Sequence, residues 1–403
     1  MLALMKYYLA LFLVLIAIEP CLAQAPAVAP IATASTGRGR LDGIGSWGYN
    51  IQKPDAAAIA NSPYDLVVID YSRTGEDEEA FTPDDIKRMQ VKPDGSRRIV
   101  LAYMSIGEAE SYRYYWHPDW SEPLRVAESG AVADESDEDA EDAPDNAKGK
   151  KPAAKKPATG KYKILKVPRL SAPIWLGREN EAWPGNFLVR YWEKGWQDII
   201  YGSPSAYLDR IVAAGFDGVF LDRVDAFTGV ADERASGRVE MVQFVTAIAR
   251  YARKLNPGFA IVPQNGEDLL REPDYLAAID GIAKEDLLFG HPNEGQPNPA
   301  VEVATSVERL SLARRAGLPV LVVEYVLVKE KTDLLRADIT GKGFLPYFGI
   351  RTLDRLILPE DLKPAAAFAA GAGARAGAPS AKRGSPVRHQ AKAKGKAAKG
   401  GNR

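Results

Sequence analysis

Two aspartates, Asp222 and Asp225, stand at the end of a hydrophobic run. The run reads "DGVFLDRVD" over 217–225, so apolar residues that suit a buried strand lead directly into carboxylates. A single acid in such a place is ordinarily a helix cap or a turn residue. The pattern recurs, however, because other apolar runs of this chain also lead into acids, amides or tyrosines. At these ends stand Asp70, Tyr71, the segment 105–108, Gln264, Asn265, Lys284, Glu285, Glu324 and Tyr325.

Acids gathered with aromatic residues suit either a metal site or carbohydrate chemistry. The common transition-metal sites need clustered histidine, cysteine and carboxylate ligands, but the sequence has only three histidines and one cysteine. We therefore expect neither a metal nor another cofactor. In carbohydrate cleavage one carboxyl group protonates the leaving oxygen, another acts at the anomeric carbon, and aromatic rings stack on the sugar. The aromatic candidates are Trp47, Tyr103, Tyr112, Tyr115, Trp116, Trp175, Trp183 and Tyr325.

Eight short apolar runs could bring these residues to one rim. They alternate with segments of helical periodicity at 203–215, 238–255 and 303–317, and continuous hydrophobicity indicates parallel strands covered on both faces. We predict an α/β fold, a (β/α)8 TIM barrel, whose strand ends form the rim on which active sites are built. An open doubly wound sheet is less favoured, because no helix begins with a G-x-G-x-x-G or P-loop motif. The predicted strands cover 43–50, 65–70, 98–106, 217–222, 259–265, 280–285, 319–325 and 343–349.

Composition sets limits on the rest of the chain. Of its 403 residues 46% are hydrophobic, and the formal net charge is -1, so we expect a large core and no binding of nucleic acid. The barrel is predicted at 41–360. Residues 1–23 are predicted to be a cleaved signal peptide, because an apolar run too short to span a bilayer follows Lys6. The acidic and then basic insert at 127–160 and the basic tail at 364–403 are predicted to be disordered, because they offer little apolar surface to bury.

The predicted leader and the basic tail also determine the expected location and partners of the protein. A cleaved leader predicts an exported protein, periplasmic or secreted, with no stable membrane span, and it removes the one cysteine, Cys21. A lipid on Cys21 is the alternative, although Glu19 and Pro20 stand where small residues are expected. The basic tail offers a contact for anionic surface polymer. We expect a monomer whose partner is a polysaccharide substrate.

Five segments resemble the motifs of a known enzyme family. They read "YDLVVIDY", "AYMSIGEAESYRYYW", "WLGRENEAWPGNFLVRYWEKGWQDII", "YLDRIVAAGFDGVFLDRVDAF" and "GIAKEDLLFG", and they span most of residues 41–350 in family order. The family they resemble is glycoside hydrolase family 114, the endo-α-1,4-polygalactosaminidases. The resemblance implies a (β/α)8 barrel that cleaves polymers containing galactosamine, while the insert and the tail depart from the family pattern.

The resemblance also implies two catalytic acids, Asp222 at the end of the fourth strand and Glu285 at the end of the sixth. Lys284 stands where a small residue is expected before the second acid, which makes Glu267 its rival. Asp222, short and held by a strand, suits an ionised nucleophile, whereas Glu285 beside the apolar Leu287 suits a protonated acid and then a base. The candidate substrate-binding residues are Asp70, Tyr103, Glu108, Tyr112, Arg113, Trp183, Asp225, Asn265, Glu324 and Tyr325.

Charge points to the form of the substrate. An acidic rim favours a cationic amino sugar over a neutral one, so we expect a partly deacetylated polymer. Two other functions stay open: the barrel could bind carbohydrate without cleaving it, and the charged insert is compatible with a structural role in the cell envelope. A binding protein would hold the polymer and release no new reducing ends.

Overall fold

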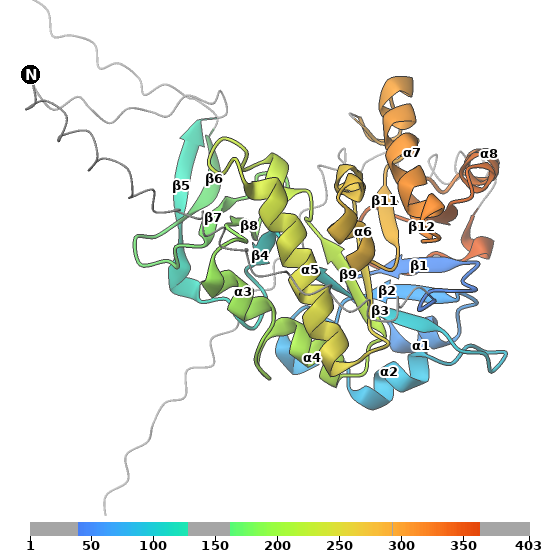
Figure 1. Cartoon of the computed structure of the whole chain (residues 1–403), viewed down its shortest axis with the longest axis horizontal. Helices are drawn as coiled ribbons and strands as arrows, with labels where there is room; N and C mark the ends of the chain where they lie inside the picture. Colours follow the sequence, from blue (N-terminus) through green and yellow to red (C-terminus); the bar gives the residue numbers. More distant parts are fainter. Residues whose placement is uncertain (1–38, 128–161, 292, 363–403) are drawn as a thin grey trace, which may run out of the picture. The chain divides into compact units, whose positions relative to one another are not determined.

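The computed structural model describes residues 39–127, 162–291 and 293–362, and Figure 1 shows its elements. The predicted leader at 1–23 and the predicted tail at 364–403 lie outside the described residues. So does the predicted insert, with one exception. Ala127, the first residue of the predicted insert, is the last residue of strand β5 (Ser121–Ala127). It pairs with Tyr162 of the neighbouring strand.

Eight parallel strands form the centre of the fold. Five pair in the order β1-β2-β3-β9-β10 and three in the order β11-β12-β13. A parallel bridge between Gln264 and Ala283 joins the two groups. Trp47 donates its indole N–H to the carbonyl of Leu345 at 2.9 Å, which links the first strand to the last. The predicted (β/α)8 barrel and all eight predicted strands are thus confirmed: β1 (Trp47–Asn50), β2 (Leu66–Ile69), β3 (Ile99–Ser105), β9 (Gly218–Asp222), β10 (Ala260–Pro263), β11 (Ile282–Glu285), β12 (Val320–Glu324) and β13 (Leu345–Phe348).

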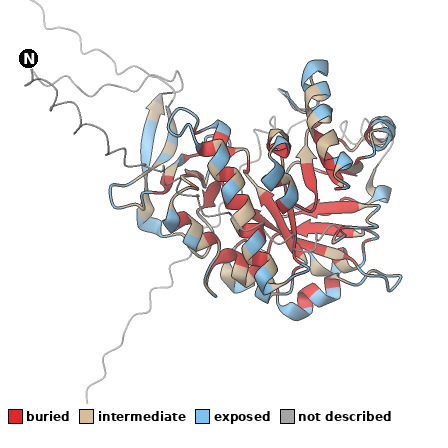
Figure 2. Ribbon diagram, viewed as in Figure 1, coloured by how far each residue is buried: buried red, intermediate tan, exposed pale blue. Residues whose placement is uncertain are grey.

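The helices follow from the periodicity of the sequence between these strands. In α5, buried Met241, Phe244, Val245 and Ile248 recur at helical spacing and pack toward the sheet. Figure 2 shows the central strands buried and the helices buried on one side only. The three predicted helical segments are confirmed by α4, α5 and α7. The helices are α1 (Ala56–Ala60), α2 (Pro83–Met89), α3 (Lys194–Ile200), α4 (Tyr207–Ala213), α5 (Gly237–Leu255), α6 (Pro273–Ala278), α7 (Ala300–Arg315) and α8 (Lys329–Gly341).

Aromatic rings fill the interior of the barrel. Trp47 lies 5.5 Å from Tyr347 and 6.4 Å from Phe220, and Tyr49 lies 5.1 Å from Phe220, all between ring centroids. Trp47 is fully buried. It therefore belongs to the core and is not free to stack on a sugar.

A second aromatic cluster lies beside the third barrel strand. Trp175 is buried and packs 5.0 Å from Trp196 and 5.2 Å from Trp120, and Tyr115 packs 5.7 Å from Trp196. Trp116 stacks 4.6 Å from the ring of Phe187. Three more of the aromatic candidates, Tyr115, Trp116 and Trp175, are thus held by other rings.

Two small sheets, which the strand pattern did not predict, interrupt the barrel between β3 and β9. One is antiparallel in the order β4 (Glu108–Glu110), β8 (Asn186–Val189), β7 (Leu176–Glu179), and the other is the hairpin of β5 and β6 (Tyr162–Pro168). Figure 1 draws them together at the side of α3. This insertion supplies residues to the rim of the barrel, as described below.

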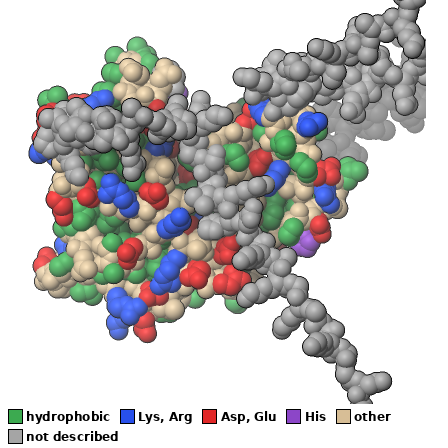
Figure 3. Space-filling view, turned by 180° about the vertical axis from the view of Figure 1, so that it is seen from behind, with side chains coloured by type: hydrophobic (Ala, Val, Ile, Leu, Met, Phe, Trp, Pro, Cys, Tyr) green, Lys and Arg blue, Asp and Glu red, His purple; other side chains and the backbone are tan. Residues whose placement is uncertain are grey.

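Acidic and basic side chains intermingle over the described part of the face drawn in Figure 3. Within the described ranges, no helix has the length and apolar character needed to cross a membrane.

Candidate active site

Asp222 ends the fourth barrel strand and is held by two donors. The hydroxyl of Tyr103, on the neighbouring strand β3, donates to its Oδ2 at 2.6 Å, and the backbone N–H of Arg223 donates to its Oδ1 at 2.8 Å. Arg223 has a positive φ of 62°, a strained conformation for a residue with a side chain and one that occurs often at active sites. The strand and the sharp turn after it fix the orientation of this carboxyl group.

Glu285 ends the sixth barrel strand and is held in a similar way. The side-chain amide of Asn265 donates to its Oε1 at 3.1 Å, and the hydroxyl of Tyr325 donates to its Oε2 at 3.0 Å. Asn265 also has a positive φ, of 61°. Residues that follow strands β10 and β12 therefore hold a carboxyl group on the strand between them.

The two carboxyl groups interact electrostatically. Burial, and after it the negative charge of Glu285, raises the pKa of Asp222 to about 7, against the opposing effects of the Tyr103 hydrogen bond and the Arg223 charge. Asp222 thus gains or loses its proton near neutral pH. The role of Asp222 as an ionised nucleophile stays a prediction; the burial and the nearby charge that raise its pKa do not show in the sequence.

Tyr49 is influenced by the charges of both carboxyl groups and was missed by sequence reasoning. It is buried, and its hydroxyl donates to Oε1 of Gln264 at 3.0 Å. Burial raises the pKa of Tyr49 well above its usual value, and the charges of Asp222 and Glu285 raise it further. Tyr49 therefore stays protonated in the core of the barrel, bonded to Gln264.

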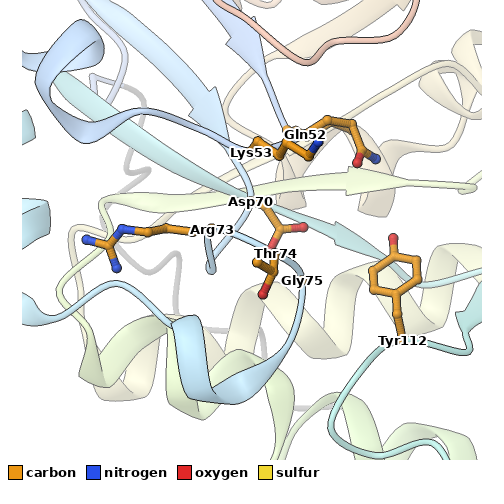
Figure 4. A pocket seen from close by; sticks show the side chains of 8 residues that line it. Gln52, Lys53, Asp70, Arg73, Thr74, Gly75 and Tyr112 are labelled. Carbon is orange, nitrogen blue, oxygen red and sulfur yellow. The ribbon is translucent and has the colours of Figure 1, made fainter. Parts of the chain in front are cut away.

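A buried ionic cluster supports the rim above β2. Arg113 donates to both oxygens of Asp70, at 2.9 and 2.7 Å, and to Glu110 at 2.6 Å. The hydroxyl of Tyr112 also donates to Glu110. Asp70 and Tyr112 line a small pocket (Figure 4) of about 20 Å³, room for about one water molecule. Asp70, Tyr112 and Arg113 are brought together, but largely to bond with one another and with Glu110, another residue that sequence reasoning missed.

Glu108 and Glu324 are buried supports. Glu108 is 1% exposed and accepts from two asparagine amides of the β7–β8 region, and one of its oxygens lies 2.9 Å from Nε of Arg223. Glu324 is fully buried and accepts from the backbone N–H groups of Leu288 and Phe289, at 2.8 and 3.2 Å, which holds the loop after β11. Trp183, by contrast, is 45% exposed in the turn between β7 and β8.

A pocket of about 370 Å³ opens beside Glu285, within the size range of ligand sites. Ser306 and Arg309 of helix α7 form one wall of it, and we call it the α7 pocket. Its surface is rich in acids. The carboxylates that line it are Asp225, Glu267, Asp268, Glu285, Asp286 and Glu302.

Glu267, the rival of Glu285, is engaged elsewhere. It lies 3.4 Å from the ammonium of Lys284 and accepts from the hydroxyl of Ser306 at 2.6 Å. Burial acts to raise the pKa of Glu267, but Lys284 and these hydrogen bonds outweigh it and lower that pKa. Glu267 is thus engaged by Lys284 and Ser306, whereas Glu285 is held by Asn265 and Tyr325. No group of three or more histidine, cysteine, aspartate or glutamate side chains among the described residues could hold a metal ion.

Comparison with known proteins gives consistent matches. The profile of the Glycoside-hydrolase family GH114 matches residues 132–359. An uncharacterized protein of Deinococcus radiodurans is 31% identical over 346 residues, which cover 84% of this chain and 91% of the relative. An uncharacterized protein of Methanocaldococcus jannaschii is 32% identical over 328 residues, 77% of each chain. The solved glycoside hydrolase domain of PelA from Pseudomonas aeruginosa is 17% identical with a TM-score of 0.48, and the match covers 78% of this chain and 97% of that domain.

Proposed function

Because this chain belongs to glycoside hydrolase family GH114, we propose that it hydrolyses α-1,4-linked polysaccharide that contains galactosamine, with Asp222 and Glu285 as the catalytic pair. One observation carries the proposal. Two carboxyl groups at the rim of the barrel, each held by a tyrosine hydroxyl, lie near enough that the charge of one raises the pKa of the other. Glycosidases that use two carboxyl groups need one of them protonated and one ionised.

In the proposed reaction Asp222 attacks the anomeric carbon while the glycosidic bond breaks and its oxygen takes the proton of Glu285. Glu285, now ionised, then removes a proton from water, and this water displaces Asp222 from the sugar. The two displacements together retain the anomeric configuration. The Asn265 amide and the hydroxyls of Tyr103 and Tyr325 keep both carboxyl groups in place through the two steps.

The charge of the substrate fits this division of roles. Burial and the charge of Glu285 raise the pKa of Asp222 to about 7, yet a nucleophile must be ionised. A sugar ammonium bound nearby lowers the pKa of a carboxyl group, so a cationic amino sugar would itself favour the reactive form. This supports a partly deacetylated polymer as the substrate.

The test is an assay of new reducing ends with partly deacetylated galactosamine polymer. We expect wild-type protein to release them and Asp222→Asn and Glu285→Gln each to lose nearly all turnover. The double variant should lose little more, because residues that act as a unit are not additive. Glu267→Gln is the matched control, which should keep measurable turnover. Wild-type-like hydrolysis by Asp222→Asn would refute the assignment, and tight binding of polymer by wild-type protein without any new reducing ends would indicate a binding protein.

A further inference from the structure

The turn that follows Asp222 lies directly against the loop that leads from β3 into β4. The backbone N–H of Ile106 donates to the carbonyl of Asp222 at 3.1 Å. A Cβ atom on Gly107 would lie 2.2 Å from the carbonyl oxygen of Arg223 and 2.9 Å from its Cβ, so this close approach requires glycine. The backbone that directs Asp222 thus packs on the first residues of the insertion between β3 and β9.

The side chain of Arg223 is held by the same insertion. Its Nε lies 2.9 Å from Oε1 of Glu108, the first residue of β4, whose side chain is 1% exposed. Burying a carboxylate is costly unless the carboxylate is paired. The ion pair therefore ties Arg223, which has the strained backbone, to the insertion.

Glu108 is itself fixed by the sheet of β4, β8 and β7. The side-chain amides of Asn180 and Asn186 donate to its Oε1 and Oε2, at 2.8 and 3.3 Å. Asn180 follows β7 and Asn186 begins β8, whose residue Leu188 is the strand partner of Glu108. Both oxygens of Glu108 thus have donors from the insertion, which sets the position of this carboxyl group.

Electrostatics links the same groups. Burial acts to lower the pKa of Arg223, but the charge of Glu108, followed by the charges of Asp225 and Asp222, outweighs it and raises that pKa. Burial and the charge of Glu285 raise the pKa of Asp222, and the charge of Arg223 acts against them. Arg223 therefore interacts with Glu108 on one side and with Asp222 on the other.

We propose that Glu108 is a positioning residue, which through Arg223 holds the turn that directs the carboxyl group of Asp222 toward the anomeric carbon. This inference rests on the proposed function. The insertion then contributes to catalysis through Glu108, although it contains neither acid of the catalytic pair. A displacement of about 1 Å at a reacting group can cost about 100-fold in rate, so loosening the turn should lower kcat more than it raises KM.

The experiment compares Glu108→Gln and Arg223→Gln with Glu179→Gln. Glutamine at position 108 keeps the shape of the side chain and removes the charge that holds Arg223. Arg223→Gln breaks the same ion pair at a side chain that is 31% exposed, so it tests the contact even if the buried substitution prevents folding. Glu179 is the matched control, because it is 5% exposed in the same sheet and accepts from the N–H groups of Lys166 and Gly185, each at 2.7 Å.

The release of reducing ends from partly deacetylated galactosamine polymer gives kcat and KM, and thermal unfolding verifies that each variant is folded. We expect Glu108→Gln and Arg223→Gln each to lower kcat about 10-fold and to change KM by less than about 3-fold. The double variant should lower kcat little further, because residues that act through one contact are not additive. Glu179→Gln should keep kcat within about 2-fold of wild type, since its hydrogen bonds do not reach the turn after β9.

Wild-type kcat in either single variant, losses that multiply in the double variant, or an equal loss in Glu179→Gln would overturn the proposal. A carbon NMR titration of the Asp222 carboxyl group adds a measurement that needs no turnover. Glu108→Gln leaves the charge of Arg223 less neutralised, so the pKa of Asp222 should fall, whereas Arg223→Gln should raise it and Glu179→Gln should leave it unchanged.

Failure of the proposed function is seen separately, as wild-type protein that releases no reducing ends from the polymer. The titration would then still decide the inference. Shifts of the expected signs would show that Glu108 acts on Asp222 through Arg223, and a pKa of Asp222 that is the same in all variants would refute it.

Discussion

We expect Asp222→Asn to make the protein more stable above neutral pH while it abolishes turnover. The pKa of Asp222 is about 7 in the folded protein and about 3.8 in the unfolded chain. Because the folded value is the higher one, the folded state binds the proton more tightly between these two values. The contribution of Asp222 to the free energy of unfolding therefore falls as pH rises from about 4 to about 7. A difference of about three pH units at about 1.36 kcal/mol each sets an upper bound of about 4 kcal/mol for this cost.

Asparagine at position 222 cannot ionise, so it avoids the cost of burying a negative charge, and it can keep both hydrogen bonds. Its carbonyl can accept from the N–H of Arg223, and its amide can donate to the hydroxyl oxygen of Tyr103, which lies 2.6 Å from Oδ2 of Asp222. Solvent at the half-buried carboxyl group reduces the full electrostatic cost, so we expect a gain of about 1–3 kcal/mol at pH 8. At pH 4 the gain should be close to zero.

The assay is urea unfolding of wild-type and variant protein at pH 4, 6 and 8, with the dependence on urea compared to verify that the same surface is exposed. Asp268→Asn serves as the control for replacing an acid of the same rim. A variant that is less stable than wild type at pH 8 would refute the reasoning. So would a gain that is as large at pH 4 as at pH 8, because that gain could not come from the proton.

Three further predictions test other parts of the argument. First, kcat/KM should rise with pH through the folded pKa of Asp222. Tyr103→Phe should shift this rise to higher pH, because it removes a hydrogen bond to the ionised form of Asp222. A fall of kcat/KM across the same pH range would instead make Asp222 the proton donor. Second, Ala127 and Tyr162 are cross-strand partners. A chain in which Asn-Gly replaces the segment between them should therefore still unfold cooperatively in urea. A far-UV circular dichroism spectrum of an unfolded chain would contradict this. Third, Edman sequencing of the exported protein should find an N-terminus near Gln24, and an intact initiator methionine would exclude a cleaved leader.

The barrel was predictable because its signal is local. Each strand is a short run of apolar residues, covered on both faces, and each is followed by a turn or a helix, so hydrophobicity alone located all eight. The small sheets between β3 and β9 lacked such a signal. In β7 the burial alternates irregularly and its pairing with β8 is broken by a register shift, so its residues do not form a continuous apolar run.

The candidate site was predictable only in part. Strand ends located Asp222 and Glu285, because the ends of parallel strands in a barrel share one rim. Tyr49 was missed because it lies inside the first predicted strand, where a tyrosine reads as core. Glu110 was missed because the sequence does not show that it pairs with Arg113. Burial and pairing are properties of the folded chain, and one sequence does not contain them.

The behaviour of Asp222 connects the chemistry of the site with its position in the fold. A carboxyl group at the mouth of a packed barrel is partly removed from water, and a second carboxyl group nearby makes its ionised form still less stable. The same burial that raises its pKa allows two hydrogen bonds to fix its direction. Substitutions that relieve the cost, such as asparagine, also remove the charge that attack on a sugar requires. On the proposed mechanism the acid that destabilises the fold is also the nucleophile, and the cationic substrate that we propose would lower the cost of ionising it at the moment of reaction.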